Sequence, residues 1–185
     1  MKMRIKSEKQ GAGSFTLIEL MAVVAVVAIL AGLVLGGAGA VRQRAARGQA
    51  KAEIAAIEAG LARYQMDFGG YPVAGTATGT NYNPSPSSYA SAGQALFTNL
   101  WGTNKFNTGS GGRKAYISVK PSMVNTSSAS TTPDYFIDPW GYAYGYYWSG
   151  TNSLYGGAAP DVWSTGGQSG GSGQTNRAKW ITSWE

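Results

Sequence analysis

The sequence contains no cysteine and no histidine among its 185 residues. Without cysteine there can be no disulfide bond and no thiol nucleophile, and without histidine there is no imidazole general base. Zinc sites built on either residue are excluded for the same reason. The acidic residues are few, and no pair of them has a spacing that argues for general acid–base catalysis. We therefore expect that the protein is not an enzyme.

Charged residues make up only 13% of the chain, whereas 27 residues are glycine. This composition is typical of a small folded head with long connections. The basic residues that give the formal net charge of +6 fall mainly into two groups, one in residues 1–14 and one just after residue 41, and the segment 20–41 between them carries no charge. Such a distribution is better explained by the flanks of a membrane segment than by a nucleic-acid surface, so we expect no nucleic-acid partner.

The uncharged segment 20–41 is strongly apolar. At about 1.5 Å per residue it would form a helix of about 33 Å, which is enough to cross a bilayer core of about 30 Å. An ordinary secretory signal has a shorter apolar region than this. The pattern predicts a transmembrane and polymerisation helix over residues 15–41. The alternative is a simple membrane anchor, in which Glu19 is tolerated because its side chain reaches the interface.

The residues before the apolar segment read Gly13-Ser14-Phe15-Thr16-Leu17-Ile18-Glu19-Leu20. This motif resembles the N-terminus of type IV pilins and of type II secretion pseudopilins, whose leader is removed just before the Phe-Thr-Leu-Ile-Glu segment. The resemblance implies a leader over residues 1–14 that a prepilin peptidase cleaves. Cleavage after Ser14 would make Phe15 the N-methylated first residue and Glu19 the fifth. Cleavage after Gly13 would make Ser14 the methylated residue and Glu19 the sixth, and both alternatives stay open.

The same resemblance gives Glu19 a role in subunit assembly, as the partner of the freed α-amino group of a neighbouring chain. A carboxylate beside a membrane span is costly and therefore points to a function. Leader processing in this family occurs on the cytoplasmic face. The expected topology is a single-pass inner-membrane protein with a cytoplasmic N-terminus and a periplasmic head, which becomes part of a periplasmic or extracellular filament.

Apolar residues continue beyond the span at steps of three and four, which predicts an amphipathic half of the same helix over residues 42–68. The stripe consists of Ala50, Ile54, Ile57, Leu61, Tyr64 and Phe68, and the charged residues Lys51, Glu53, Glu58 and Arg63 are expected to lie away from it. The adjacent glycines Gly69 and Gly70 predict the end of the helix.

The remaining residues, 69–185, are predicted to form a globular head with Gly/Ser-rich loops. We expect a short helix at 95–101, strands at 140–148, 161–164 and 180–184, and loops at 73–92, 122–133 and 165–178. The fold class is therefore α+β, pilin-like, with a long N-terminal helix packed on a small antiparallel sheet. The alternating aromatic residues of 140–148 would form either a packed core face or a platform for a sugar or single-stranded nucleic acid.

The head also resembles major pseudopilins, most specifically at Asp138-Pro139-Trp140-Gly141. Here Asp138 and Pro139 would set a turn, and Gly141 would allow close approach of another backbone. Major pseudopilins hold a structural calcium ion in the C-terminal loop. Calcium requires six to eight oxygen ligands, and this chain has no acidic residue between Asp161 and Glu185, so Asp161 and Ser164 are only weak calcium candidates and we expect no other cofactor.

The resemblance implies a filament subunit of a type II secretion system. Its partners would be further copies of the chain, the prepilin peptidase, the inner-membrane assembly platform and minor pseudopilins. Two alternatives stay open. One is a type IV pilus subunit for adhesion, motility or DNA uptake, and the other is a membrane-anchored carbohydrate-binding protein that uses the aromatic strand.

Overall fold

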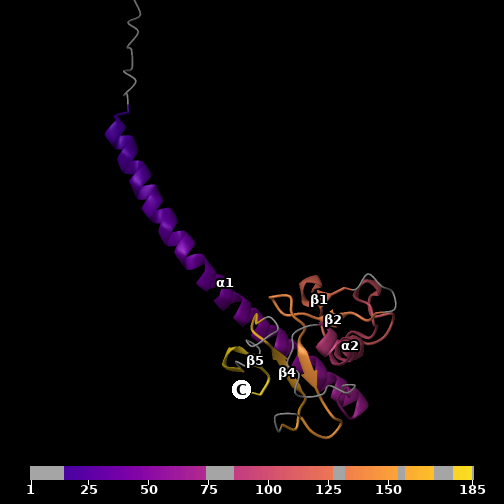
Figure 1. Ribbon diagram of the computed structural model, residues 1–185. Helices are drawn as coiled ribbons and strands as arrows, with labels where there is room; N and C mark the ends of the chain where they lie inside the picture. Colours follow the sequence, from indigo (N-terminus) through magenta and orange to yellow (C-terminus); the bar gives the residue numbers. More distant parts are fainter. Residues whose placement is uncertain (1–14, 74–85, 127–131, 154–156, 169–176, 185) are drawn as a thin grey trace, which may run out of the picture. The chain divides into compact units, whose positions relative to one another are not determined.

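A computed structural model describes residues 15–73, 86–126, 132–153, 157–168 and 177–184 (Figure 1). The chain divides into two compact units, residues 1–42 and residues 43–185. Helix α1 (Leu17–Phe68) supplies the described secondary structure of the first unit, and its remaining residues belong to the second. The described part of the second unit, which we call the head, also contains α2 (Pro86–Trp101), five short strands and short 3₁₀ turns.

Residues 43–68 of α1 bury one stripe of side chains in the head. Ala50, Ile54, Ile57 and Leu61 are all at most 2% exposed, which confirms the predicted stripe over these positions. The helix ends at Gly69, which adopts a left-handed φ of 73° and donates its N–H to the carbonyl of Gln65. A glycine adopts this conformation without steric cost, so it terminates the helix as the sequence indicates.

Two expectations about this stripe were wrong. Phe68, at its end, is 64% exposed, whereas Glu53, expected on the outer face, is only 8% exposed. The Glu53 carboxylate lies in the interior because it accepts a hydrogen bond from the buried Tyr144 hydroxyl. A buried charged group is tolerated when it is hydrogen-bonded in this way.

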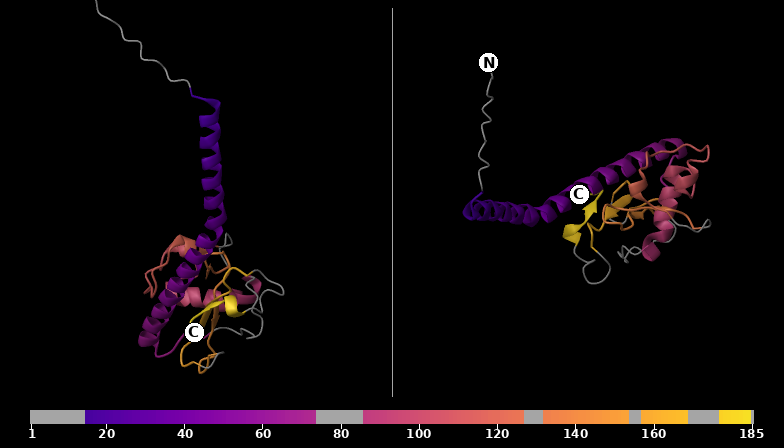
Figure 2. Two further views of the ribbon diagram at one scale, coloured as in Figure 1. Left: turned by 90° about the vertical axis from the view of Figure 1, so that its left-hand side faces the viewer. Right: turned by 90° about the horizontal axis from the view of Figure 1, so that it is seen from above.

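Helix α2 begins at Pro86, so the prediction of a loop over residues 73–92 was wrong from Pro86 onward. Proline is favoured in the first turn of a helix, because its φ angle is already helical and its missing N–H would have no partner there. Leu96, Phe97 and Leu100 of α2 are fully buried, and Figures 1 and 2 show α2 beside the strands of the head.

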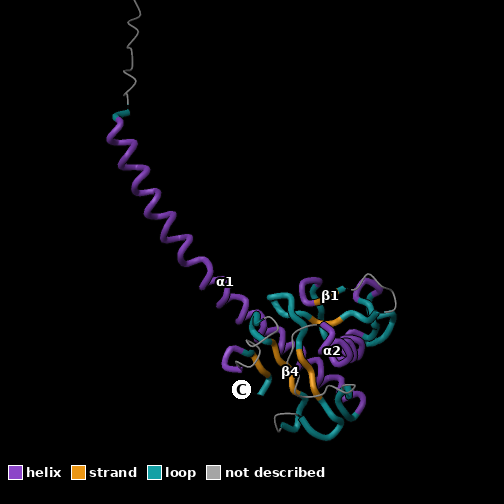
Figure 3. Tube along the Cα trace, viewed as in Figure 1, coloured by secondary structure: helices purple, strands orange, loops and turns teal. Residues whose placement is uncertain are grey.

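The strands form two small antiparallel sheets. One sheet has the order β3 (Gly145–Tyr147), β4 (Asp161–Ser164) and β5 (Ile181–Thr182), and the other pairs β1 (Val124–Asn125) with β2 (Tyr135–Phe136). Strand β4 has the predicted bounds, whereas β5 is shorter than predicted. Short 3₁₀ turns cover Phe106–Thr108, Pro121–Met123 and Arg177–Lys179. Loops connect these short elements throughout the head (Figure 3).

Two loop predictions were wrong at their edges. The segment 122–133 contains β1 and part of the Pro121–Met123 turn, and 165–178 includes the start of the Arg177–Lys179 turn. Composition favoured loops in both segments. Pairing of Val124 with Phe136 stabilises β1 instead, and this contact links residues far apart in the sequence.

The predicted nine-residue strand over 140–148 was also wrong, because only Gly145–Tyr147 form a strand. The segment before it is a turn in which the Asp138 carboxylate accepts the backbone N–H groups of Trp140 and Tyr142, at 3.0 and 2.9 Å. Gly141 supplies the left-handed φ of 84°, and apart from its chain neighbours no described residue has an atom within 4 Å of the position its Cβ would take. Its function is therefore to adopt a positive φ rather than to allow close approach.

Close approach occurs instead at Gly145, which pairs with Trp163 across β3 and β4. A Cβ atom at Gly145 would overlap the indole ring of Trp163. The small residues that alternate with the aromatic ones thus make room for a tryptophan from the neighbouring strand.

Two hydrophobic clusters stabilise the head. The larger lies between α1, α2 and the strands and includes Tyr144, Tyr146 and Trp148, so these three residues follow the packed-core alternative. The smaller contains Trp163 and Trp180, whose parallel rings lie 6.3 Å apart. The fold is α+β, with the N-terminal helix packed on small antiparallel sheets.

Candidate functional site

The first turn of α1 contains a reciprocal pair of hydrogen bonds between Thr16 and Glu19. The backbone N–H and the hydroxyl of Thr16 donate to Oε2 of Glu19, at 2.9 and 2.7 Å. The backbone N–H of Glu19 in turn approaches the Thr16 hydroxyl at 3.4 Å. This arrangement is a capping box, in which two side chains satisfy N–H groups that have no partner within the helix.

The capping box fixes the Glu19 side chain at the start of the helix. Because both bonds from Thr16 reach Oε2, the other carboxylate oxygen, Oε1, makes no hydrogen bond to any of the described residues. A carboxylate accepts about four hydrogen bonds, so an additional cationic donor can bind here. The sequence signal for this geometry is Thr-x-x-Glu, which our sequence analysis did not use.

Large apolar side chains cover every side of α1 between residues 17 and 33. Each is more than half exposed, for example Leu17 at 74% and Leu33 at 70%. The set comprises Leu17, Ile18, Leu20, Met21, Val23, Val24, Val26, Val27, Ile29, Leu30 and Leu33. A helix that is apolar all round is normally buried, and a contiguous apolar surface of this extent marks an interaction site.

Among the helices that the structure describes, none is both long enough and apolar enough to cross a bilayer. The transmembrane expectation for residues 15–41 therefore stays a prediction. Of the expected leader-cleavage residues, Gly13 and Ser14 lie outside the described residues, and Phe15 lies two residues before α1 and is 77% exposed.

In the head, the Asp138 carboxylate is buried and accepts three hydrogen bonds. Besides the two backbone N–H groups of the turn, it accepts the Ser164 hydroxyl at 2.7 Å, and Ser164 accepts the N–H of Gly166 at 3.0 Å. Burial raises the pKa of Asp138, an effect that the hydrogen bonds from Ser164, Tyr142 and Trp140 only partly offset. This group joins the turn before β3 to the end of β4.

A second buried carboxylate, Glu53, joins α1 to the same region. Tyr144 donates its hydroxyl to Oε2 at 2.7 Å, and Gln49, one turn earlier on α1, donates to Oε1 at 2.8 Å. Burial and the Glu53 carboxylate together raise the pKa of Tyr144 strongly, so the tyrosine stays protonated and remains a donor.

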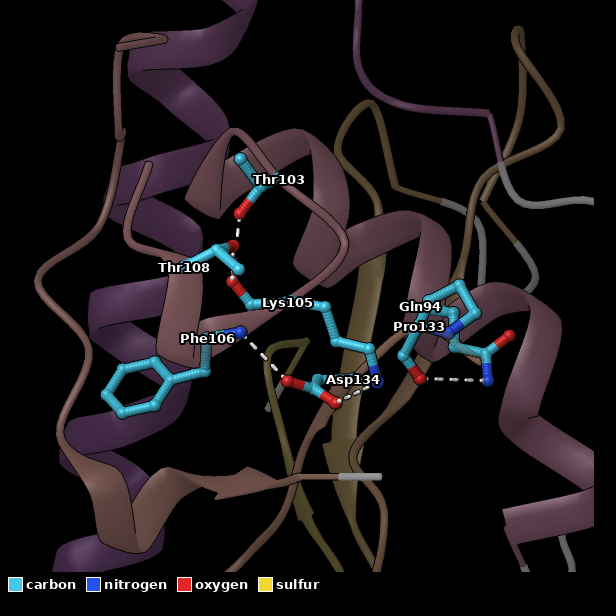
Figure 4. A network of polar contacts seen from close by, with 7 residues as sticks. All are labelled: Gln94, Thr103, Lys105, Phe106, Thr108, Pro133 and Asp134. Carbon is cyan, nitrogen blue, oxygen red and sulfur yellow. Dashed lines mark hydrogen bonds and ion pairs between the residues drawn. The ribbon is translucent and has the colours of Figure 1, made fainter. Parts of the chain in front are cut away.

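A third buried carboxylate, Asp134, fastens the loop after α2 (Figure 4). Its Oδ1 lies 3.3 Å from the Lys105 ammonium, and its Oδ2 accepts the N–H of Phe106 at 2.8 Å. Gln94 of α2 donates to the neighbouring Pro133 carbonyl at 3.2 Å. Glu53, Asp134 and Asp138 therefore each connect segments of the head, and their partners indicate a structural role.

The two calcium candidates do not come together. Successive side chains of a strand point to opposite faces, so Asp161 and Ser164, three positions apart on β4, lie on opposite sides of the sheet. The Ser164 hydroxyl already donates to Asp138. Among the described residues there is also no group of three or more acidic side chains that could hold a metal ion. The described residues thus show no shared site for Asp161 and Ser164.

The comparisons with known proteins give one relevant relative. The chain is 29% identical over 116 residues to type II secretion system core protein G of Pectobacterium carotovorum subsp. carotovorum, an alignment that covers 58% of this chain and 74% of the relative. The chain is a pseudopilin-like protein. No family model and no solved structure matches it.

For a pseudopilin-like protein, the described site is the start of α1 rather than a cleft in the head. The structure brings Glu19 and Thr16 together there. It does not bring Asp161 and Ser164 together. The structural functions of Glu53 and Asp134 are not apparent from the sequence, because neither residue lies in a local motif that indicates burial.

Proposed function

We propose that this protein is a structural subunit of a type II secretion pseudopilus, which assembles through its apolar N-terminal helix. The similarity to a type II secretion core protein supports a pseudopilin role in secretion. The observation that carries the assembly mechanism is the exposed apolar surface of α1 residues 17–33, which requires other apolar groups to cover it.

In this proposal the precursor is a single-pass inner-membrane protein until a prepilin peptidase removes residues 1–14. The new N-terminus, at Ser14 or Phe15, is methylated, and its amine pairs with Glu19 of another subunit. The capping box supports this role because it fixes Glu19 while leaving Oε1 without a partner among the described residues. An ammonium group would compensate the carboxylate within an apolar bundle.

The head then lies on the periplasmic side. Three of its buried acids, Glu53, Asp134 and Asp138, are committed to internal hydrogen bonds, which supports a non-enzymatic role. The further partners are the inner-membrane assembly platform and the minor pseudopilins. The aromatic residues Tyr144 and Tyr146 are 1% exposed and cannot offer a sugar-binding platform without unfolding.

Two measurements on the protein from a host with an active prepilin peptidase test this function. Intact mass and N-terminal peptide mapping should show a chain that begins at Ser14 or Phe15 and carries one added methyl group. Electron microscopy after overproduction should show filaments for the wild type and for Glu58→Gln, an exposed acid of α1 in the head. Glu19→Ala should be processed but should not assemble.

A chain that keeps residues 1–14 despite an active peptidase would refute the proposal. Normal filaments formed by Glu19→Ala would refute the role of the carboxylate alone.

A further inference from the structure

The loop between β4 and β5 is closed at its base. Gly166 and Gly167, just after β4, lie beside Lys179, just before β5, and we call these three residues the loop base. A Cβ atom at Gly166 would overlap the carbonyl oxygen of Lys179. The positive φ angles of both glycines, 66° and 83°, allow this approach, which no residue with a side chain could make without strain.

Helix α1 contacts the loop base directly through Arg47 and indirectly through Gln43 and Trp140. The guanidinium of Arg47 donates to the Lys179 carbonyl at 2.8 Å, and its Nη1 lies 3.3 Å from the Cβ position of Gly166. One turn earlier, Gln43 accepts the indole N–H of Trp140 at 3.1 Å, and the Trp140 ring lies against Gly167. Residues four apart on a helix share a face, so Arg47 contacts the loop base directly, and Gln43 on the same face binds Trp140, which packs against it.

A buried group fastens the same loop base from the sheet side. The N–H of Gly166 donates to the Ser164 hydroxyl, which donates to the buried Asp138 carboxylate. The first residues of the loop are thus hydrogen-bonded within the head, and the last residue, Lys179, is hydrogen-bonded to α1.

We propose that Arg47 performs in this protein the task that a calcium ion performs in major pseudopilins, so that the loop base is held against α1 without a metal. The comparison with calcium rests on the proposed function, whereas the contact itself does not. Calcium binds carbonyl and carboxylate oxygens. The Lys179 carbonyl is one such oxygen, and the guanidinium already binds it. A fixed positive charge at the loop base also repels a divalent cation.

Limited proteolysis of the full-length protein in detergent micelles tests this proposal. A lysine-specific endoproteinase cuts after Lys179, and mass spectrometry gives the rate. We expect Arg47→Ala to be cut about three- to tenfold faster than the wild type, because the lost hydrogen bond is exposed to solvent and therefore weaker than a buried one to a charged group. Arg47→Lys, which keeps one donor, should fall between them. Arg44→Ala, an exposed arginine on the same helix, should match the wild type.

A second measurement, the effect of calcium on the cleavage rate, uses the wild type alone. The cleavage rate after Lys179 should be the same in a chelator and in about 5 mM calcium, a concentration above the ~10⁻³ M range of weak extracellular sites. A more than about threefold slower cut in calcium would show a metal site and overturn the proposal.

An unchanged rate in Arg47→Ala, with folding confirmed by near-ultraviolet circular dichroism, would also overturn it. If Arg47→Ala does not fold, the cleavage rate of Arg47→Lys and the effect of calcium on the wild type still test the proposal. A failure of leader processing or of assembly would refute the proposed function without changing any of these rates.

Discussion

The hydrogen bond between Tyr144 and Glu53 connects α1 to the segment before β3, and removing it should destabilise the head. Tyr144 is 1% exposed, and its hydroxyl lies 2.7 Å from Oε2 of Glu53. Tyr144→Phe deletes only the hydroxyl and leaves the carboxylate buried with one donor fewer. Losing a hydrogen bond to a charged group costs about 1.5–3 kcal/mol.

For a domain of this size, about 1 kcal/mol corresponds to about 2–4 °C in Tm, so we expect a loss of about 3–12 °C. The assay is thermal unfolding of the full-length protein in detergent micelles, followed by tryptophan fluorescence. The matched control is Tyr147→Phe on β3, whose hydroxyl has no hydrogen bond within the described part of the chain.

A thermodynamic cycle with Glu53→Gln separates the pair from the surrounding packing. If Tyr144 acts through Glu53, the double variant will lose less free energy of unfolding than the sum of the losses in the two single variants. Equal Tm values for Tyr144→Phe and Tyr147→Phe would refute the reasoning.

Three further predictions concern the head. Because burial raises the pKa of Asp138 above its usual 3.8, its protonated form favours folding, and this contribution disappears as the pH rises through the raised value. Urea titrations across that range should show the wild type losing free energy of unfolding relative to Asp138→Asn, and parallel curves would contradict this. Asp134→Ala removes the buried carboxylate beside Lys105 and should lower the free energy of unfolding in denaturant by about 3–5 kcal/mol. Asp134→Asn keeps an acceptor for the N–H of Phe106 and should lower it less. Gly145→Ala would force a methyl group into the Trp163 ring and should lower the free energy of unfolding by about 3 kcal/mol. Gly70→Ala should change it little, because none of the described residues beyond its chain neighbours lies within 4 Å of the new methyl group. Similar losses of free energy in the two variants would contradict the packing argument.

Local patterns predicted the parts of the fold that depend on local chemistry. The apolar stripe of Ala50, Ile54 and Ile57 identified the buried face of α1 because a helix repeats every 3.6 residues. The adjacent glycines Gly69 and Gly70 identified the end of α1. Strand β4 was predictable from its apolar and β-branched residues, and the motif around Asp138 identified the turn.

The parts that failed depend on distant partners. The alternation in 140–148 predicted a long strand, but hydrogen bonds from Trp140 and Tyr142 to Asp138 stabilise a turn there. Glu53 looked like an outer-face residue because its partner, Tyr144, lies 91 positions away. The start of α2 resembled a loop in composition, and β1 depends on pairing with β2. Only tertiary structure identifies such contacts.

At the candidate site, the sequence identified Glu19 through its position beside the apolar segment. The capping box with Thr16 was also predictable from the Thr-x-x-Glu spacing. The contact of Arg47 with Lys179 was not, since 132 positions separate the two residues.

The most direct test of the central claim is the location of exported proteins in a strain that lacks this gene. If the protein is a secretion pseudopilin, deletion will leave folded exported enzymes in the periplasm, the full-length gene will restore them to the medium, and Glu19→Ala will not. Normal secretion in the deletion strain, with loss of surface pili, adhesion or DNA uptake instead, would contradict the account and favour a type IV pilus subunit.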